Sequence, residues 1–186
     1  MGHTKKKCGC CCQPPRVKRL PYATISDKNA DDELGSLFSI SPVTETILWS
    51  AATQPSGNTC LNGPLTTWFN TSTGIFTIQE SGLYQVQFMG KLQPDPSISG
   101  TVTVTILRSL RDATKRCANS NLNPTNTDDF SSFVNGSTSV SGTLPLVVGD
   151  TLAFQTQIIG FSGTAQAFFE INVVQLSRAD IGKIEF

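Results

Sequence analysis

The stretch that decides the fold is Gly74 to Phe88, which reads GIFTIQESGLYQVQF. Phe76 and Ile78 alternate with polar residues, and from Tyr84 to Phe88 an aromatic or branched residue alternates with glutamine. Such alternation predicts β-strands with one buried face, because successive side chains of a strand point to opposite faces of the sheet. The residues between the two runs, Gln79 to Gly82, are typical of a turn. The stretch therefore predicts two short strands joined by a turn.

The chain after residue 36 repeats this pattern of short strands and turns. Glycine, proline and asparagine clusters separate the apolar runs, for example at residues 54–57, 62–64 and 119–129. Many short strands without a long helix indicate an all-β sandwich. The ten candidate strands are residues 37–40, 46–51, 65–69, 75–78, 82–92, 101–110, 130–141, 144–148, 151–159 and 165–176.

The length of 186 residues favours one domain with appended tails. Residues 1–35 are predicted to form an extended cysteine-rich arm and linker, since Pro14, Pro15 and Pro21 forbid regular helix. Residues 36–176 are predicted to form the sandwich, and residues 177–186 a C-terminal extension. Two short patches of the arm could pair with the edge of a sheet. The candidate docking residues in these patches are Val17, Leu20, Tyr22 and Ile25.

Charge divides the chain into a basic arm and an acidic body. Residues 1–20 hold six of the 14 basic residues and no acid, so residues 21–186 hold 14 − 6 = 8 basic and 14 acidic residues, a net charge of −6. The acidic body lacks the basic stripe of a nucleic-acid-binding protein. The arm either serves solubility or docks on an acidic surface, such as that of a neighbouring subunit.

No segment of the sequence predicts insertion into a membrane or classical export. No apolar run approaches the roughly 18 residues of a membrane-spanning helix. Lys5 to Lys7 are not followed by the apolar core of a signal peptide. We therefore expect neither a membrane span nor a cleaved leader.

The sequence offers little for catalysis. The one histidine, His3, lies in the arm, so the body has no histidine-based triad or proton relay. The two acidic clusters, at residues 31–33 and 128–129, are interpreted as solvated loop acids rather than a glycosidase pair or calcium ligands. Phosphate-binding glycine motifs are missing. The sequence predicts a protein that is not an enzyme and uses no metal or cofactor.

Cysteine is concentrated in the arm. Adjacent cysteines bridge each other poorly, because a disulfide needs Cα atoms about 5.5 Å apart with converging side chains. Intermolecular disulfides are the favoured interpretation, and a metal site, lipidation and reduced thiols are the alternatives. The four arm candidates are Cys8, Cys10, Cys11 and Cys12. The body cysteines, Cys60 and Cys117, are candidates for a bridge within the chain or between protomers, or for unpaired thiols.

The spacing G-x-F-x5-G-x-Y-x-V-x-F over residues 74–88 resembles the signature of the tumour-necrosis-factor and complement globular-head superfamily. Leu144 to Phe154 resembles that family's late L-x-L-x-x-G-D-x-L pattern, and Ala167 to Leu176 its closing strand. The resemblance covers roughly residues 37–176. It implies a jelly roll that closes into a trimer around an apolar axis. By position in the motifs, the candidates for core or axis packing are Tyr84, Phe88, Phe154 and Phe168.

The cysteine-rich arm replaces the collagen stalk, membrane anchor or leader of the cytokine and complement members. In this respect the chain resembles jelly-roll subunits of bacterial spore-surface layers and endospore appendages. The resemblance implies a structural homotrimer that self-assembles on the spore surface into a fibre or layer, through docked arms and disulfides. The alternative is a ligand- or receptor-binding trimeric head of a spore coat, or of a viral or phage fibre tip on a virion surface. Its arm would bind an anchoring surface protein.

Overall fold

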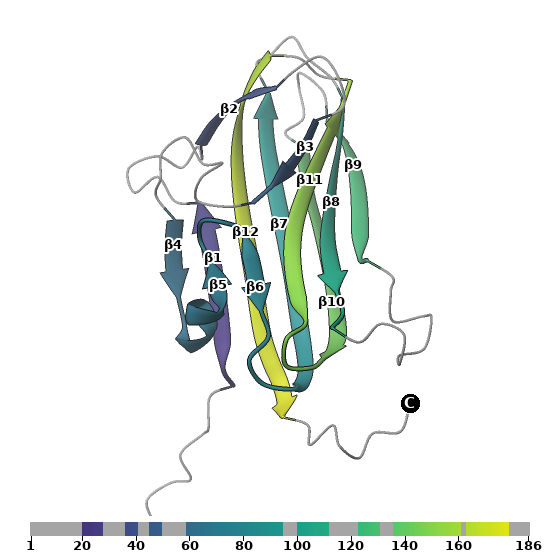
Figure 1. Ribbon diagram of the computed structural model, residues 1–186. Helices are drawn as coiled ribbons and strands as arrows, with labels where there is room; N and C mark the ends of the chain where they lie inside the picture. The colour runs from purple at the N-terminus through teal and green to yellow at the C-terminus, as the bar shows by residue number, and fades with distance from the viewer. Residues whose placement is uncertain are drawn as a thin grey trace, which may run out of the picture.

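The computed structural model describes residues 20–27, 36–40, 45–49, 59–94, 100–111, 123–130, 136–160 and 163–178. Twelve strands in these residues form two facing antiparallel sheets (Figure 1). The predicted all-β jelly-roll sandwich is confirmed. The strands are β1 (Tyr22–Asp27), β2 (Ser36–Ile40), β3 (Glu45–Leu48), β4 (Thr59–Asn62), β5 (Phe69–Asn70), β6 (Ile75–Thr77), β7 (Gly82–Pro94), β8 (Gly100–Ser109), β9 (Thr125–Phe130), β10 (Gly136–Leu146), β11 (Thr151–Ile159) and β12 (Gly163–Arg178).

The strand order defines the edges of each sheet. Sheet A has the order β10-β7-β12-β1-β4, and β2 pairs with the first part of β12. Sheet B has the order β5-β6-β11-β8-β9, and β3 pairs with the second half of β11. The longest pairing joins β7 to β12, from Gly82 opposite Arg178 to Pro94 opposite Ala165. Sheet A therefore ends at β10 on one side. On the other side it ends at β2 beside the first part of β12 and at β4 beyond β1.

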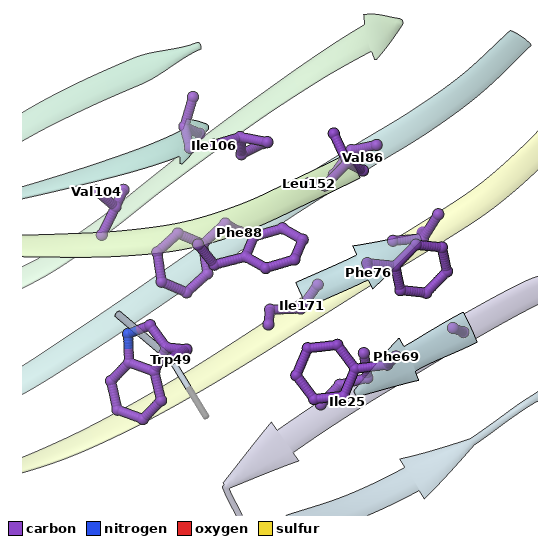
Figure 2. Packing of buried hydrophobic residues seen from close by; sticks show 14 of the residues in the cluster. Ile25, Trp49, Phe69, Phe76, Val86, Phe88, Val104, Ile106, Leu152 and Ile171 are labelled. Carbon is purple, nitrogen blue, oxygen red and sulfur yellow. The ribbon is translucent and has the colours of Figure 1, made fainter. Parts of the chain in front are cut away.

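The core lies between the sheets and follows from the alternation in the sequence. In β11 the side chains of Leu152, Phe154, Thr156 and Ile158 are buried, while the residues between them are partly exposed. Phe88 of β7 packs against Phe154, with ring centroids 5.5 Å apart. Figure 2 shows the apolar side chains of both sheets meeting in this layer. Burial of this many aromatic and branched side chains is the main stabilising term of the fold.

The sandwich begins earlier than the predicted boundary at residue 36. Tyr22–Asp27 forms β1, which lies between β12 and β4 with Ala23 and Ile25 buried. This segment alternates apolar and polar residues like the other strands, although it is short and precedes a polar stretch. Residues 22–27 are therefore part of the sandwich and not of the predicted arm and linker.

Three strand predictions were wrong in detail. Residues 64–68 form a short 3-10 helix, η2 (Pro64–Trp68), and only Phe69 and Asn70 continue as β5. Residues 119–129 were predicted as a turn, yet Thr125–Phe130 pairs with β8. The two strands predicted at residues 130–141 and 144–148 are instead β9 and β10, and β10 runs without a break to Leu146. By contrast, the predicted strand at residues 151–159 coincides with β11.

Candidate functional site

The residues of the 74–88 motif build the sandwich itself. Gly74 has φ 71°, a conformation that favours glycine, and its N–H donates to the carbonyl of Asn70 at 2.8 Å. The side-chain oxygen of Asn70 accepts from the N–H groups of Ser72 and Thr73. This closed turn brings β6 back along β5 and places Phe76 in the core. The motif is therefore structural.

The Gly149-Asp150 pair of the second motif joins three segments. Asp150 is fully buried, and its carboxylate accepts from the N–H groups of Arg111 and Val147, both at 2.9 Å. Its backbone carbonyl accepts from Ile78, and the N–H of Gly149 donates to the carbonyl of Ile78. Gly149 has φ 90°, which a side chain would strain. The motif fastens β6, β8 and the β10–β11 turn together.

A polar cluster closes the lower end of the sandwich in Figure 1, where β1 begins and β12 ends. The hydroxyl of Tyr84 donates to the carbonyl of Glu80 and accepts from the amide of Gln175 at 3.0 Å. Arg178 pairs with the Glu80 carboxylate at 3.0 Å. A register shift in β12 between Gln175 and Ser177 occurs at this point, and Gln175 is 1% exposed.

This environment changes the acidity of Tyr84. Burial raises the pKa of Tyr84 to about 12, and the negative charge of Glu80 adds to the increase. The Arg178 guanidinium and the hydrogen bond from Gln175 act in the opposite direction. A buried, neutral phenol held by backbone and amide partners is suited to locking strand ends together, since it offers no available base or nucleophile at neutral pH.

Three of the four aromatic residues singled out by the motifs lie inside a single protomer. Tyr84, Phe88 and Phe154 are fully buried between the sheets, so they pack the core and do not form an outer surface. Phe168 lies in β12 opposite Lys91 of β7, and its side chain lies outside the described set. The sequence reasoning missed Trp49 and Phe169, whose rings contact each other in the core. Trp49 had a signal, because it lies in a predicted strand.

The cysteine and arm candidates are only partly visible. Cys60 lies in β4, exposed, and without a disulfide partner among the described residues. Of the docking candidates, Ile25 is buried in β1, Tyr22 is half-buried at its start, and Leu20 is 50% exposed just before it. The remaining candidates lie outside the described residues, and these are Cys8, Cys10, Cys11, Cys12, Val17 and Cys117.

The strand registers bring an array of mostly uncharged polar side chains together on the outer face of sheet A. Cross-strand partners align in three rows that run from β4 or β1 to β10. The rows are Cys60, Ser26, Glu170, Met89 and Ser139; then Asn62, Thr24, Asn172, Gln87 and Ser141; then Tyr22, Val174, Gln85 and Thr143. Glu170 is the one carboxylate in these rows, and no lysine or arginine is among them.

Side chains of this face bond to each other. Thr24 donates to Asn172 at 2.8 Å, and Asn172 donates to the Glu170 carboxylate at 2.6 Å. These bonds leave a face of mostly half-buried, fixed and uncharged groups. Such a face suits contact with another protein surface, because charged residues are depleted at the centres of protein interfaces.

Two features are missing from the described residues, a metal-binding cluster and a membrane-spanning helix. No group of three or more histidine, cysteine or acidic side chains is placed to hold a metal ion within the described ranges. In those same parts of the chain, no helix has the length and apolarity that crossing a membrane would require.

The sequence matches no family model and no curated protein. Several solved structures have a fold similar to that of this chain. The globular domain of a zebrafish complement 1qA protein has a TM-score of 0.53 at 16% identity, covering 86% of this chain and 99% of that domain. The PRD1 vertex protein P5 has a TM-score of 0.51 at 13% identity, covering 85% of this chain and 98% of that one. Eiger TNF from S. frugiperda has a TM-score of 0.41 at 15% identity, covering 89% and 99%. The chain therefore has a jelly-roll fold of the complement globular-head type.

Proposed function

We propose that the chain is a structural, self-assembling subunit of a fibre or surface layer, of the endospore appendage or exosporium type. Homotrimeric jelly-roll heads are joined head to tail by docked N-terminal arms and disulfides. The single observation that carries the proposal is the mostly uncharged outer face of sheet A, on a fold shared with a complement globular head. A structural role also fits the burial of both sequence motifs in the core.

When two protein surfaces associate, the groups between them lose their contact with water. Removing a charged group from water costs several kcal/mol unless it is paired, whereas amides and hydroxyls can exchange water for partners across an interface. Glu170 is the one carboxylate of the three rows and is already bonded to Asn172, so these rows can be covered at low cost. A stable interface needs about 800 Å² from each partner, an area of the order of one sheet face.

In this proposal the N-terminal arm connects one trimer to the next. Because β1 already pairs within its own sheet, the segment left for docking on a neighbour is residues 1–20. Its six basic residues and four cysteines suit attachment to an acidic neighbour and covalent locking.

The trimer is tested with a matched pair of charge insertions. Gln87 lies at the centre of the outer face of sheet A, and Gln157 lies in β11 of sheet B with its neighbours Thr156 and Ile158 buried. Gln87→Arg should give monomers and Gln157→Arg should leave trimers, as measured by light scattering coupled to size exclusion. Trimers in both variants, or monomers in the unmodified protein, would contradict the proposed face.

The arm is tested by deletion and by removing its thiols. A chain lacking residues 1–20 should remain a folded, soluble trimer that no longer elongates, and continued elongation would exclude the arm from the mechanism. Replacing Cys8, Cys10, Cys11 and Cys12 by Ser should permit assembly but make the assembly dissociate on heating or in denaturant. Undiminished resistance would show that these thiols are not the lock.

The second candidate function is a trimeric ligand- or receptor-binding head that an anchoring protein holds through the arm, on a spore coat or a virion. The likeness of the fold to the PRD1 vertex protein P5 favours it. Such a head would stay a discrete trimer in isolation and would form larger structures only when its anchor is added.

A further inference from the structure

Two edge strands of sheet A, β10 and β4, differ in whether other residues cover them. At β10, the carbonyl of Ser139 accepts from the side-chain amide of Asn126 at 2.9 Å, and Pro124 lies over Gly142. At β4, no strand among the described residues pairs with the outer side, and Cys60 and its two successors are exposed. An unpaired edge strand presents backbone groups that an extended peptide can pair with.

The charge around β4 indicates what kind of peptide fits. Cys60 lies opposite Ser26 of β1, and Ser26 lies opposite Glu170 of β12, so the three share one row of the outer face. Asp27 lies opposite Thr59 at the end of the same pairing. Neither β1 nor β4 contains a lysine or arginine. Two copies of this edge would repel each other, whereas a basic segment would be attracted.

The chain itself contains such a segment. Residues 1–20 carry six basic residues, no acid and four cysteines. At about 3.3 Å per residue, an extended segment of this length reaches roughly 60 Å, which is more than the length of a sheet.

The segment of the same molecule starts in the wrong place to pair with its own β4. The carbonyl of Pro21 accepts from the N–H of Gln175 at 2.9 Å, so the chain still runs in line with β1 beyond the start of that strand. β4 pairs with the opposite half of β1, from Thr24 to Asp27. Between the two lies η2, which contacts β1 so closely that a Cβ on Gly63 would stand 2.3 Å from the carbonyl oxygen of Tyr22.

We propose that the outer edge of β4 is the docking site for the N-terminal segment of a second copy of this chain, which adds as a further strand and is joined to Cys60 by a disulfide from its cysteine cluster. This proposal rests on the proposed function and names its acceptor site. The oxidant is a low-molecular-weight disulfide. One protein thiolate attacks it and releases a small thiol, and the second protein thiolate then displaces the other small thiol. The protein gains one S–S bond and loses two thiol protons.

The experiment mixes equal amounts of reduced full-length chain with natural and with ¹⁵N isotopes, before assembly, and adds glutathione disulfide. After digestion, mass spectrometry should find peptides of residues 8–16 linked to the Cys60 peptide in mixed-isotope pairs. Cys60→Ser should remove these species, and Cys117→Ser should leave them.

Three results would overturn the docking site. They are a Cys60–Cys117 bridge, arm-to-Cys60 links found only within one isotope, and no linkage of Cys60 at all. Electron microscopy of the same samples separates this failure from that of the proposed function. Assemblies that form without an arm-to-Cys60 link overturn only the docking site, whereas a chain that never assembles overturns both.

Discussion

The two sides of the sandwich differ in the hydrogen bonds that other residues make to the outermost strands. On the β9 and β10 side, the N–H of Ile106 donates to the carbonyl of Pro124, and the N–H of Arg108 donates to the side chain of Asn123. Asn126 then reaches across to the carbonyl of Ser139 on the other sheet. On the β4 side, a four-residue strand forms the margin of sheet A at the left of Figure 1.

The difference shows two ways of managing the edges of a sheet. A cap hinders pairing with another chain, because a side chain already occupies a backbone carbonyl of the edge strand and lies over it. A short edge strand with exposed side chains keeps the ability to pair, and among the described strands β4 pairs only with β1. The proposal therefore assigns protection of the fold to the β9 and β10 side and assembly to the β4 side.

The largest expected effect on the free energy of unfolding is at Gly63, on the β4 side, and Gly142 of β10 provides the comparison. Gly63, between β4 and η2, has φ 104°, and a Cβ there would meet the carbonyl oxygen of Tyr22 at 2.3 Å. A Cβ on Gly142 would meet the ring of Pro124 at 3.1 Å and the side chain of Leu144 at 3.5 Å, and no backbone atom is as close. Gly63→Ala should cost about 3 kcal/mol in the free energy of unfolding, and Gly142→Ala less than about 1 kcal/mol. Urea denaturation measures both, and equal losses would contradict the comparison.

The next effect concerns Tyr84, at the end of the sandwich that both sides share. Its folded-state pKa of about 12 lies above the ordinary value of 10.0, so its stabilising effect is complete below pH 10. That effect is lost as the pH rises through about 12, and the loss is about 2 kcal/mol. Tyr84→Phe should lower stability at neutral pH by about 1 kcal/mol, because Gln175 loses a partner. The variant should also show a smaller decline between pH 10 and 12.

Tyr22→Phe is the matched control for this experiment. The chain has two tyrosines, so this variant leaves Tyr84 as the one phenol in the ultraviolet spectrum. Its absorbance change near 295 nm should follow the unfolding transition at high pH. An alkaline decline of the same size in Tyr84→Phe as in the unmodified protein would show that Tyr84 is not its cause.

A smaller effect is expected from removing the cap of β10. Asn126→Ala takes away the donor to the Ser139 carbonyl and should cost about 1 kcal/mol in unfolding free energy. It should also leave the edge of β10 free to pair with other molecules of the variant. Light scattering would detect this association even in a chain lacking residues 1–20. A variant that loses stability but stays unassociated would show that the cap does not guard the edge.

The smallest effect on the protomer is expected at the open edge. Cys60→Ser changes an exposed side chain and should alter the unfolding free energy, measured in reductant, by less than about 0.5 kcal/mol. The same change should make oxidised assemblies dissociate at a lower denaturant concentration. An unaltered dissociation midpoint would show that no disulfide of Cys60 stabilises the assembly.

The sequence predicted the strands whose residues alternate strongly. β11 and most of β7 and β8 follow from runs such as residues 101–106, where threonine alternates with valine or isoleucine. The prediction failed where local chemistry competes with apolarity. Pro64 and the positive φ of Gly63 start a 3-10 turn in an apolar run, and the polar strand β9 is held by pairing with β8, not by its own composition.

The candidate site was less predictable than the fold. A motif identified Tyr84, Phe88 and Phe154 as packing residues, but only the three-dimensional structure separates a core position from an outer surface. The outer face of sheet A consists of serine, threonine, asparagine and glutamine from five separate strands. Single strands give no sign that these residues will align, because the registers depend on long-range pairing.

The central claim is that this chain builds an assembly by itself, and negative-stain electron microscopy of the purified full-length protein tests it most directly. The protein should be imaged with and without reductant. Fibres or layers of jelly-roll heads, more resistant to denaturant when oxidised, are the predicted result. Discrete particles under both conditions would contradict the account and would favour a head that needs a separate anchor.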